Sequence, residues 1–223
     1  MISAHTRAPR LVIFDCDGVL VDSEVISNAV LARMLTRHGL ATTLAQARRS
    51  YQGLLLADVL ARAQEALGHA LPEDFLERYQ SERDAAFRGE LEPVDGAEEA
   101  IEQILRAGIG VCVASQGAAS KMRLTLALTG LDRHFPDGAR FSAEAVPRGK
   151  PFPDLFLHAA SSMGAAPAEC VVVEDTPSGV AAARAAQMRV LGLVADGDEA
   201  ALRSARAEII HSLAELPSRL NLG

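Results

Sequence analysis

Four apolar residues near the start of the chain run directly into two aspartates and a glycine, in the stretch LVIFDCDG at residues 11–18. A short, continuous apolar run that stops at a polar turn is typical of a strand buried on both faces, as in a parallel sheet. In extended backbone Asp15 and Asp17 point the same way, while Cys16 points the opposite way. Gly18 permits the sharp turn that leaves both carboxylates accessible.

Similar apolar runs predict further strands, at residues 110–114, 170–173 and 189–194, with a weaker one at 208–210. Helical patterns separate them, at residues 97–107, 120–129, 154–163 and 178–186. For the first of these helices, Asp95 is the expected N-cap and Glu98 completes a capping box. Strands that alternate with helices of this length predict βαβ units and a parallel sheet.

About seventy residues between Asp22 and Pro93 contain no strand-like run, which is far longer than an ordinary crossover connection. Apolar residues in this interval recur at helical spacing instead. The expected fold class is therefore α/β, a Rossmann-like parallel-sheet core with an inserted all-α helical cap. We expect a flexible tail at residues 1–9, the core at residues 10–21 and 94–223, and the cap at residues 22–93.

Composition limits the classes of partner that this chain is expected to bind. The formal net charge of −7, with no basic patch, argues against nucleic-acid binding, and no stretch reaches the ~20 apolar residues that span a bilayer. Cys16, Cys112 and Cys170 are odd in number and show no pairing pattern, as expected for reduced thiols in a cytoplasmic protein. No apolar segment of signal-peptide length follows the first ten residues. We expect a monomer or weak dimer that acts on a small molecule.

Polar side chains follow three of the expected strands, at Asp15 and Asp17, at Ser115, and at Glu174 and Asp175. The carboxyl ends of parallel strands share one edge, where ligands of open α/β sheets bind. Four carboxylates gathered there would repel one another unless a cation lay among them. An all-oxygen set without His or Cys favours a hard ion, Mg²⁺ above all.

The same edge can also hold a phosphate. Lys150, in a Gly-Lys-Pro loop, could reach it and offset negative charge. Ser115, together with the backbone amides of Gln116 and Gly117 near a helix N-terminus, offers a phosphate cradle. Positioning groups, a metal ion and charge neutralisation are what a phosphoryl transfer requires.

Four segments, taken in order, resemble the four motifs of the haloacid dehalogenase superfamily. They are DCDGVLVDSE at residues 15–24, VASQG at 113–117, GKPFPD at 149–154 and VEDTPSG at 173–179. The resemblance is to the branch with a helical cap after the first strand, which includes sugar phosphatases and β-phosphoglucomutases. It spans essentially residues 11–194. It implies a Mg²⁺-dependent hydrolase of a small phosphorylated metabolite, such as a sugar phosphate or a sugar-acid phosphate like 6-phosphogluconate.

The resemblance also implies roles for individual residues. Asp15 would be the nucleophile that forms an aspartyl-phosphate, and Asp17 the acid and then the base. Dehalogenases of the superfamily lack this second aspartate, so Asp17 favours phosphate chemistry. The phosphoryl oxygens would be held by Ser115, Gln116 and Lys150, and the Mg²⁺ by Asp15, the main-chain carbonyl of Asp17, Glu174 and Asp175. Substrate specificity would involve Arg49, Gly53, Leu54 and Lys121.

Two departures from the family pattern concern the substrate. Gln116 stands where the sugar-phosphatase relatives usually carry Asn. Leu54 follows Gly53 in the cap's specificity loop, where members that act on sugar phosphates often place a basic or polar residue. This leucine-rich loop argues against a bulky, highly charged substrate.

Other interpretations stay open at this stage. The chain could be a β-phosphoglucomutase-like phosphomutase, which passes the phosphoryl group to a sugar instead of water. It could also be a non-catalytic binding protein that keeps only the scaffold. Glu174 and Asp175, taken alone, could merely cap the helix that begins near Ser178. The intact set of five residues argues against a purely structural role: Asp15, Asp17, Ser115, Lys150 and Asp175.

Overall fold

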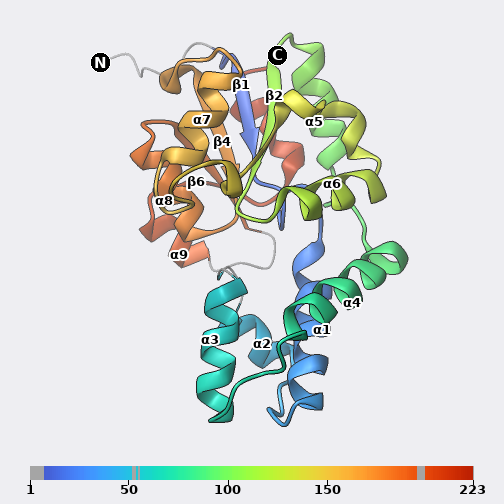
Figure 1. Ribbon diagram of the computed structural model, residues 1–223. Coiled ribbons are helices and arrows are strands. Elements are labelled where there is room, and N and C mark those ends of the chain that lie inside the picture. Colours follow the sequence, from blue (N-terminus) through green and yellow to red (C-terminus); the bar gives the residue numbers. More distant parts are fainter. Residues whose placement is uncertain (1–7, 52–53, 55, 195–198, 223) are drawn as a thin grey trace. The chain divides into compact units, whose positions relative to one another are not determined.

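The computed structural model describes residues 8–51, 54, 56–194 and 199–222. Contacts divide the chain into two compact units (Figure 1). The first, here called the core unit, comprises Met1–Val21 and Pro93–Gly223, and the second, the helical unit, comprises Asp22–Glu92. The chain therefore leaves the core unit once, directly after the first strand and turn, and returns to it once.

The core unit is built on a six-stranded sheet in the order β3-β2-β1-β4-β5-β6, and every neighbouring pair is parallel. The strands are β1 (Leu11–Phe14), β2 (Gly110–Ser115), β3 (Arg140–Ser142), β4 (Cys170–Glu174), β5 (Arg189–Leu193) and β6 (Glu208–Ile210). This order reverses direction at β1, which pairs with β2 on one side and β4 on the other. Such a switch point is where open α/β sheets bind ligands, outside the carboxyl ends of the strands.

Helices cover both faces of the sheet, with α7 and α8 on one side and α5 on the other (Figure 1). The helices of the core unit are α5 (Ala97–Arg106), α6 (Ala119–Leu128), α7 (Asp154–Ser162), α8 (Pro177–Ala185), α9 (Glu199–Ser204) and α10 (Leu216–Arg219). In the part of the chain that the structure describes, short 3-10 helices also lie between them: η1 (Leu131–His134), η2 (Asp137–Ala139), η3 (Ala143–Ala145), η4 (Pro167–Glu169) and η5 (Leu213–Glu215). Because both faces are covered, all four residues of β1 are buried, as the uninterrupted apolar run predicts.

The helical unit has a hydrophobic core of its own. Its helices are α1 (Ser23–Arg37), α2 (Leu44–Tyr51), α3 (Leu56–Leu67) and α4 (Phe75–Glu90). Buried side chains from each of them form one cluster, which includes Leu35, Tyr51, Ala63 and Phe75. The described part of this unit contains only helices and loops. The insert is thus all-α and can bury apolar surface without help from the sheet.

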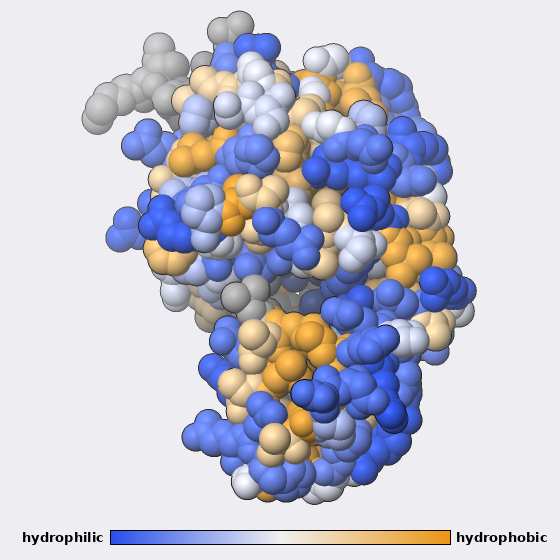
Figure 2. All heavy atoms as spheres, viewed as in Figure 1, coloured by the Kyte–Doolittle hydropathy of each residue, from blue (hydrophilic) through white to orange (hydrophobic). Residues whose placement is uncertain are grey.

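The molecular surface is mostly hydrophilic in the view of Figure 2. The large apolar side chains that are exposed come from separate segments: Leu44, Leu105, Leu128, Phe152 and Leu157. Within the residues that the structure describes, no helix is long and apolar enough to cross a membrane.

The Rossmann-like parallel-sheet prediction is confirmed, and the predicted strands and core helices end within one residue of the observed ones. One predicted helix cap was wrong, and one strand of the sheet was missed. Asp95 is not the N-cap of α5, because Gly96 takes that place in a left-handed conformation with φ 77°, and no side chain caps the helix. Strand β3 was missed because it has only three residues and just one, Phe141, is a large apolar side chain.

Leu155 and Leu157 offer a matched test of the core on one helix. Leu155 of α7 is fully buried in the main core cluster, whereas Leu157 is 39% exposed. We expect Leu155→Ala to lower the free energy of unfolding by about 2–5 kcal/mol, because it leaves a cavity in a close-packed core. Leu157→Ala should change it by no more than about 0.5 kcal/mol. Urea denaturation followed by circular dichroism measures both, and equal losses would contradict the packing described.

Candidate active site

The carboxyl ends of β1, β2 and β4 meet at one edge of the sheet. The residue pairs Phe14–Val113 and Phe14–Val173 are in register, so Asp15 emerges between the two neighbouring strands. The Asp15 amide donates to the carbonyl of Val173 at 2.9 Å, which continues the β1–β4 ladder by one residue. The backbone that carries Asp15 is therefore as rigid as the strands themselves.

A tight turn follows Asp15 and brings Asp175 against it. Gly18 has φ 80° and donates its amide to the carbonyl of Val21 at 2.9 Å. A Cβ atom on Gly18 would overlap the carboxylate of Asp175, so the turn requires glycine both for its conformation and for space. One carboxylate oxygen each from Asp15, Glu174 and Asp175 lies within 4.8 Å of the others. Three of the four acidic side chains that the sequence analysis places at the strand edge thus meet there.

Lys150 lies between two of these carboxylates. Its Nζ donates to Asp15 Oδ1 and to Glu174 Oε1, both at 2.5 Å, and its side chain is only 3% exposed. The same Nζ lies 5.1 Å from the centre of the Phe156 ring. Burial opposes the charge of this ammonium, but the two carboxylates outweigh that effect and raise the pKa of Lys150 above its ordinary value. Lys150 is therefore cationic at every physiological pH.

The side chain of Asp15 is buried, and burial disfavours its ionised form. Desolvation by burial, aided by the nearby charges of Glu174 and Asp17 and opposed by Lys150, raises the pKa of Asp15 to about 7. An additional cation beside Asp15 would favour the ionised form and lower this pKa again. An additional cation at this edge would therefore stabilise the ionised carboxylate of Asp15.

Glu174 is completely buried, and both of its carboxylate oxygens accept hydrogen bonds. Its Oε2 accepts hydrogen bonds from the Asp175 and Thr176 amides at 3.0 Å each and from Thr176 Oγ1 at 2.9 Å, while Oε1 accepts from Lys150. A Cβ atom on Gly179 would overlap this carboxylate, so α8 approaches it closely. Glu174 therefore holds both Lys150 and the turn that presents Asp175.

A second ion pair lies beside the first. Lys121 Nζ is 2.7 Å from Asp17 Oδ1, and both side chains are mostly buried. Ser115 is 1% exposed, and its Oγ accepts a hydrogen bond from the Gly117 amide at 3.0 Å. A Cβ atom on Gly117 would lie 3.3 Å from Ser115 Oγ and 3.5 Å from Asp17 Oδ2, so these groups are neighbours. The loop after β2 thus joins the same edge as Asp15.

A model of the haloacid dehalogenase-like hydrolase family matches residues 9–187. The chain belongs to this family. The resemblance inferred from the four motifs is therefore confirmed, and the matched region includes every acidic and basic residue of the strand edge described above.

Three comparisons illustrate the relatives of this hydrolase. The 6-phosphogluconate phosphatase of Escherichia coli (strain K12) is 30% identical over 207 residues, which are 92% of each chain. A family hydrolase from Deinococcus radiodurans R1, solved with bound phosphate and sodium, is 33% identical, has a TM-score of 0.81 and aligns over 96% of both chains. The β-phosphoglucomutase of Mycobacterium bovis is 43% identical over 100 residues, which are 44% of this chain and 37% of that protein.

The predicted phosphate ligand Gln116 has another partner in the hydrolase. Its Oε1 accepts a hydrogen bond from the Lys150 amide at 2.8 Å, and a Cβ atom on Gly149 would overlap its side-chain amide. The side chain of Gln116 thus fixes the backbone of the loop that carries Lys150. Likewise Lys121, predicted to contact substrate, lies on Asp17.

Three of the predicted specificity residues of the hydrolase belong to the helical unit. Arg49 is an exposed residue of α2, and Leu54 packs partly buried against the core of its own unit. Gly53 lies outside the described residues.

Two residues of the edge were missed by the sequence analysis. Thr176 bonds Glu174 and also caps α8, since its Oγ1 accepts from the Gly179 amide at 3.1 Å. Its position directly before Pro177, at the start of a helix, is a signal that could have found it. Ser142 donates to the Gly117 carbonyl at 2.8 Å, and the sequence carries no comparable signal for it because β3 itself was missed.

The contact between Gln116 and Gly149 can be tested by a double-mutant cycle. We expect Gly149→Ala to lower kcat/KM by about tenfold or more, because the new methyl group displaces the Gln116 amide and with it the Lys150 loop. Gln116→Ala removes the obstruction, so the double variant should be more active than Gly149→Ala alone. The matched control is Gly89→Ala, which meets nothing within 4 Å. Simple additivity of the two losses would contradict the proposed contact.

Proposed function

We propose that this hydrolase is a Mg²⁺-dependent phosphatase that forms an aspartyl-phosphate on Asp15 and releases inorganic phosphate from a small phosphorylated metabolite. The observation that carries the proposal is the buried Asp15 carboxylate at the strand edge, in contact with Lys150 and close to Asp175. A carboxylate so fixed is suited to covalent catalysis, and the ammonium beside it is suited to an anionic substrate. Membership of the hydrolase family supports the same conclusion.

The residues at this edge fit Mg²⁺. The donor set is all oxygen, which suits a hard cation, and the pKa of Asp15 indicates that more positive charge would stabilise its ionised form. We assign the ion to Asp15, Asp175 and the main-chain carbonyl of Asp17. Glu174 stands next to them, and its four hydrogen bonds favour a supporting role over direct ligation. When bound, Mg²⁺ would withdraw charge from the phosphoryl oxygens.

A second group of acids is a weaker candidate for the metal. Glu98, Glu102 and His134 also offer atoms within 4.8 Å of one another. However, Glu98 pairs with Arg133, and Glu102 pairs with Arg106 at 2.8 Å. These guanidinium groups already neutralise the carboxylates, so the strand edge is the better place for a divalent ion.

In the first step, an Asp15 carboxylate oxygen attacks phosphorus and the bond from phosphorus to the ester oxygen breaks. Asp17, which is protonated at the start of this step, gives its proton to the departing oxygen, so the alcohol leaves neutral. Lys150 and Ser115 bind the phosphoryl oxygens and stabilise the charge that spreads over them in the transition state. The products of this step are the free alcohol and a phosphorylated Asp15.

In the second step, the now ionised Asp17 takes a proton from water. The water oxygen attacks phosphorus, the bond between phosphorus and Asp15 breaks, and the carboxylate of Asp15 is restored. Lys121 would hold the Asp17 side chain near both reacting oxygens through its ion pair. Gln116 contributes indirectly, by fixing the loop that carries Lys150.

The substrate class we propose is a sugar phosphate or a sugar-acid phosphate such as 6-phosphogluconate. Similarity over 92% of both chains to a 6-phosphogluconate phosphatase supports this class. We further propose that the helical unit acts as the cap that selects the substrate, through Arg49, Gly53 and Leu54. A cap that closes before the first step would exclude bulk water.

A phosphomutase is the second candidate, because a β-phosphoglucomutase is 43% identical over 100 residues. A mutase would transfer the group from Asp15 to a sugar rather than to water. Incubation with β-glucose 1-phosphate and a bisphosphate primer distinguishes the two. Glucose 6-phosphate as the main product would establish the mutase, and inorganic phosphate would support the phosphatase.

Asp15→Asn tests the nucleophile. We expect phosphatase activity to fall by about 10³-fold or more, since an amide cannot form the acyl phosphate. Circular dichroism should show an unchanged fold. The control is Asp137→Asn, the same chemical change at a side chain that is 94% exposed, which should retain full activity. Near-normal turnover by Asp15→Asn would refute the assignment.

Removal of divalent cations tests the metal. We expect a chelator to abolish hydrolysis of 6-phosphogluconate and of other phosphorylated metabolites, and added Mg²⁺ to restore it. Inorganic phosphate release is the measurement. Undiminished release from chelator-treated, metal-free protein would exclude the proposed dependence on Mg²⁺.

A further inference from the structure

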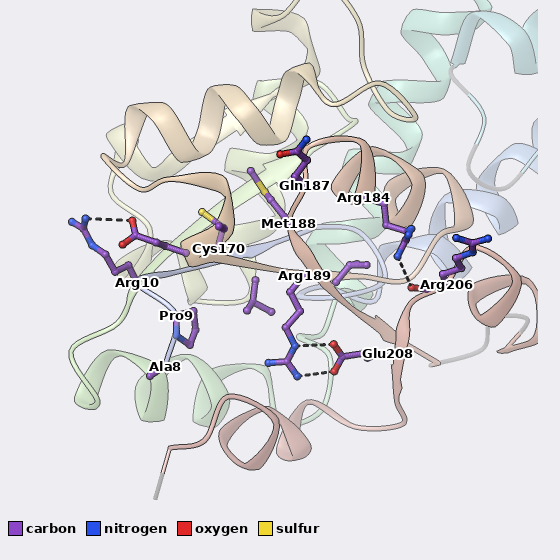
Figure 3. Close-up of a pocket in the computed structure, with 14 residues that line it drawn as sticks. Ala8, Pro9, Arg10, Cys170, Arg184, Gln187, Met188, Arg189, Arg206 and Glu208 are labelled. Atoms are coloured by element: carbon purple, nitrogen blue, oxygen red, sulfur yellow. Dashed lines mark hydrogen bonds and ion pairs between the residues drawn. The ribbon is translucent and has the colours of Figure 1, made fainter. Parts of the chain in front are cut away.

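A cavity lies at the opposite edge of the sheet from Asp15. Its volume is about 490 Å³, and it is lined by residues at the starts of four parallel strands: Arg10 before β1, Cys170 in β4, Arg189 in β5 and Glu208 in β6 (Figure 3). Because parallel strands begin at one edge and end at the other, this cavity is separate from the catalytic edge. Its volume is within the range of small-molecule sites in proteins.

The lining is basic although the chain is acidic. Four arginines and two glutamates line the cavity, whereas the whole chain has a formal net charge of −7. A local excess of guanidinium groups in an acidic protein favours an anion at that place. The four arginines differ in how far contacts within the protein already engage their guanidinium groups.

Arg189 is occupied by structural contacts. Its Nε and Nη2 donate to the two carboxylate oxygens of Glu208 at 2.8 and 2.6 Å (Figure 3). Its Nη1 donates to the Arg219 carbonyl at 2.9 Å. This network joins β5, β6 and the C-terminal helix. Arg10 pairs loosely with Glu169 at 3.5 Å, and its side chain is 62% exposed.

Arg184 and Arg206 are the two lining arginines that are best placed to bind an anion. Arg184 Nη1 lies 3.4 Å from the Arg206 carbonyl, which brings the end of α8 next to the turn before β6 (Figure 3). Across residues 8–51, 54, 56–194 and 199–222, neither guanidinium forms an ion pair with a carboxylate. Two arginines on adjoining segments, for which the described residues supply no carboxylate partner, would be stabilised by an anion, and the planar guanidinium fork matches phosphate oxygens in pairs.

The backbone at this cavity is unusual for its residue types. Gln187 has φ 60° and Arg206 has φ 69°, and each follows a helix, α8 or α9, where glycine is the common choice. Both residues line the cavity. Left-handed backbone at a non-glycine residue stores strain, and such residues gather at ligand sites. At these two positions the rim of the cavity therefore carries the long polar side chains of Gln187 and Arg206, which a glycine would not supply.

The floor between these polar groups is apolar. Val171, Met188 and Val190 line it and are at most 5% exposed. A ligand made only of charge, such as a bare ion, would leave this surface unused. An anionic group joined to a flat apolar part would use both the rim and the floor.

We propose that this cavity binds an organic phosphate with a flat apolar part, its phosphate on Arg184 and Arg206 and its apolar part against the floor of Val171, Met188 and Val190. The class is represented by a nucleoside monophosphate. The site is distinct from the catalytic edge and does not depend on the reaction proposed there. Its ligand bridges the end of α8 and the turn between α9 and β6.

Isothermal titration calorimetry with adenosine 5′-monophosphate tests the proposal. The full chain carries Asp15→Asn and is kept in chelator, so that the probe is not consumed. We expect binding that weakens at least tenfold in Arg184→Ala/Arg206→Ala and is unchanged in Arg203→Ala, an exposed arginine of α9 that pairs with Glu199 and does not line the cavity. Thermal melting of each variant in the absence of probe confirms that the fold is intact.

Fragments of the probe separate the two halves of the site. Inorganic phosphate should bind more weakly than the nucleotide but show the same dependence on the two arginines, and adenosine should bind without that dependence. Equal binding by the double variant and the parent, or no binding by the parent, would overturn the site. Tighter binding of citrate than of the nucleotide would overturn the assignment to phosphate.

Discussion

The buried ammonium of Lys150, held between Asp15 and Glu174, is the contact on which the strand edge depends. It joins a loop between β3 and α7 to the ends of β1 and β4, and none of the three side chains is more than 9% exposed. Breaking a buried ion pair from one side leaves an uncompensated charge, at a typical cost of about 3–5 kcal/mol. The energetic contributions of these three residues are therefore coupled, and a substitution at one of them also changes the contribution of the other two.

Much of the surrounding structure serves to keep this unit in place. Gln116 holds the Lys150 backbone, Thr176 and the Asp175 amide hold Glu174, and the β1–β4 ladder holds Asp15. Every one of these supports is a hydrogen bond between residues of the core unit. Catalytic groups fixed in this way need little rearrangement when charge develops on a substrate, which is the basis of electrostatic preorganisation.

The sequence predicted the sheet and the edge well because both rest on local patterns. An apolar run that stops at Asp15, Ser115 or Glu174 marks a buried strand and its carboxyl end, and parallel topology then brings the three together. The contacts that the sequence did not predict are those between segments that are distant in the chain. Nothing local indicates that Gln116 reaches the Lys150 amide or that Lys121 reaches Asp17. The cap of α5 was mispredicted because a left-handed Gly96 replaced a side chain with ordinary capping propensity.

The close approach of α8 to Glu174 limits how this sequence can change. Gly179 leaves room for the Glu174 carboxylate, and any side chain at position 179 would occupy that room. The two positions thus share one volume, and a larger residue can enter the helix only if a shorter one replaces the glutamate. Such a replacement would also release Lys150. Substitution at position 179 is therefore tied, through steric exclusion alone, to the charge balance around Asp15, although the two residues are 164 positions apart in the sequence.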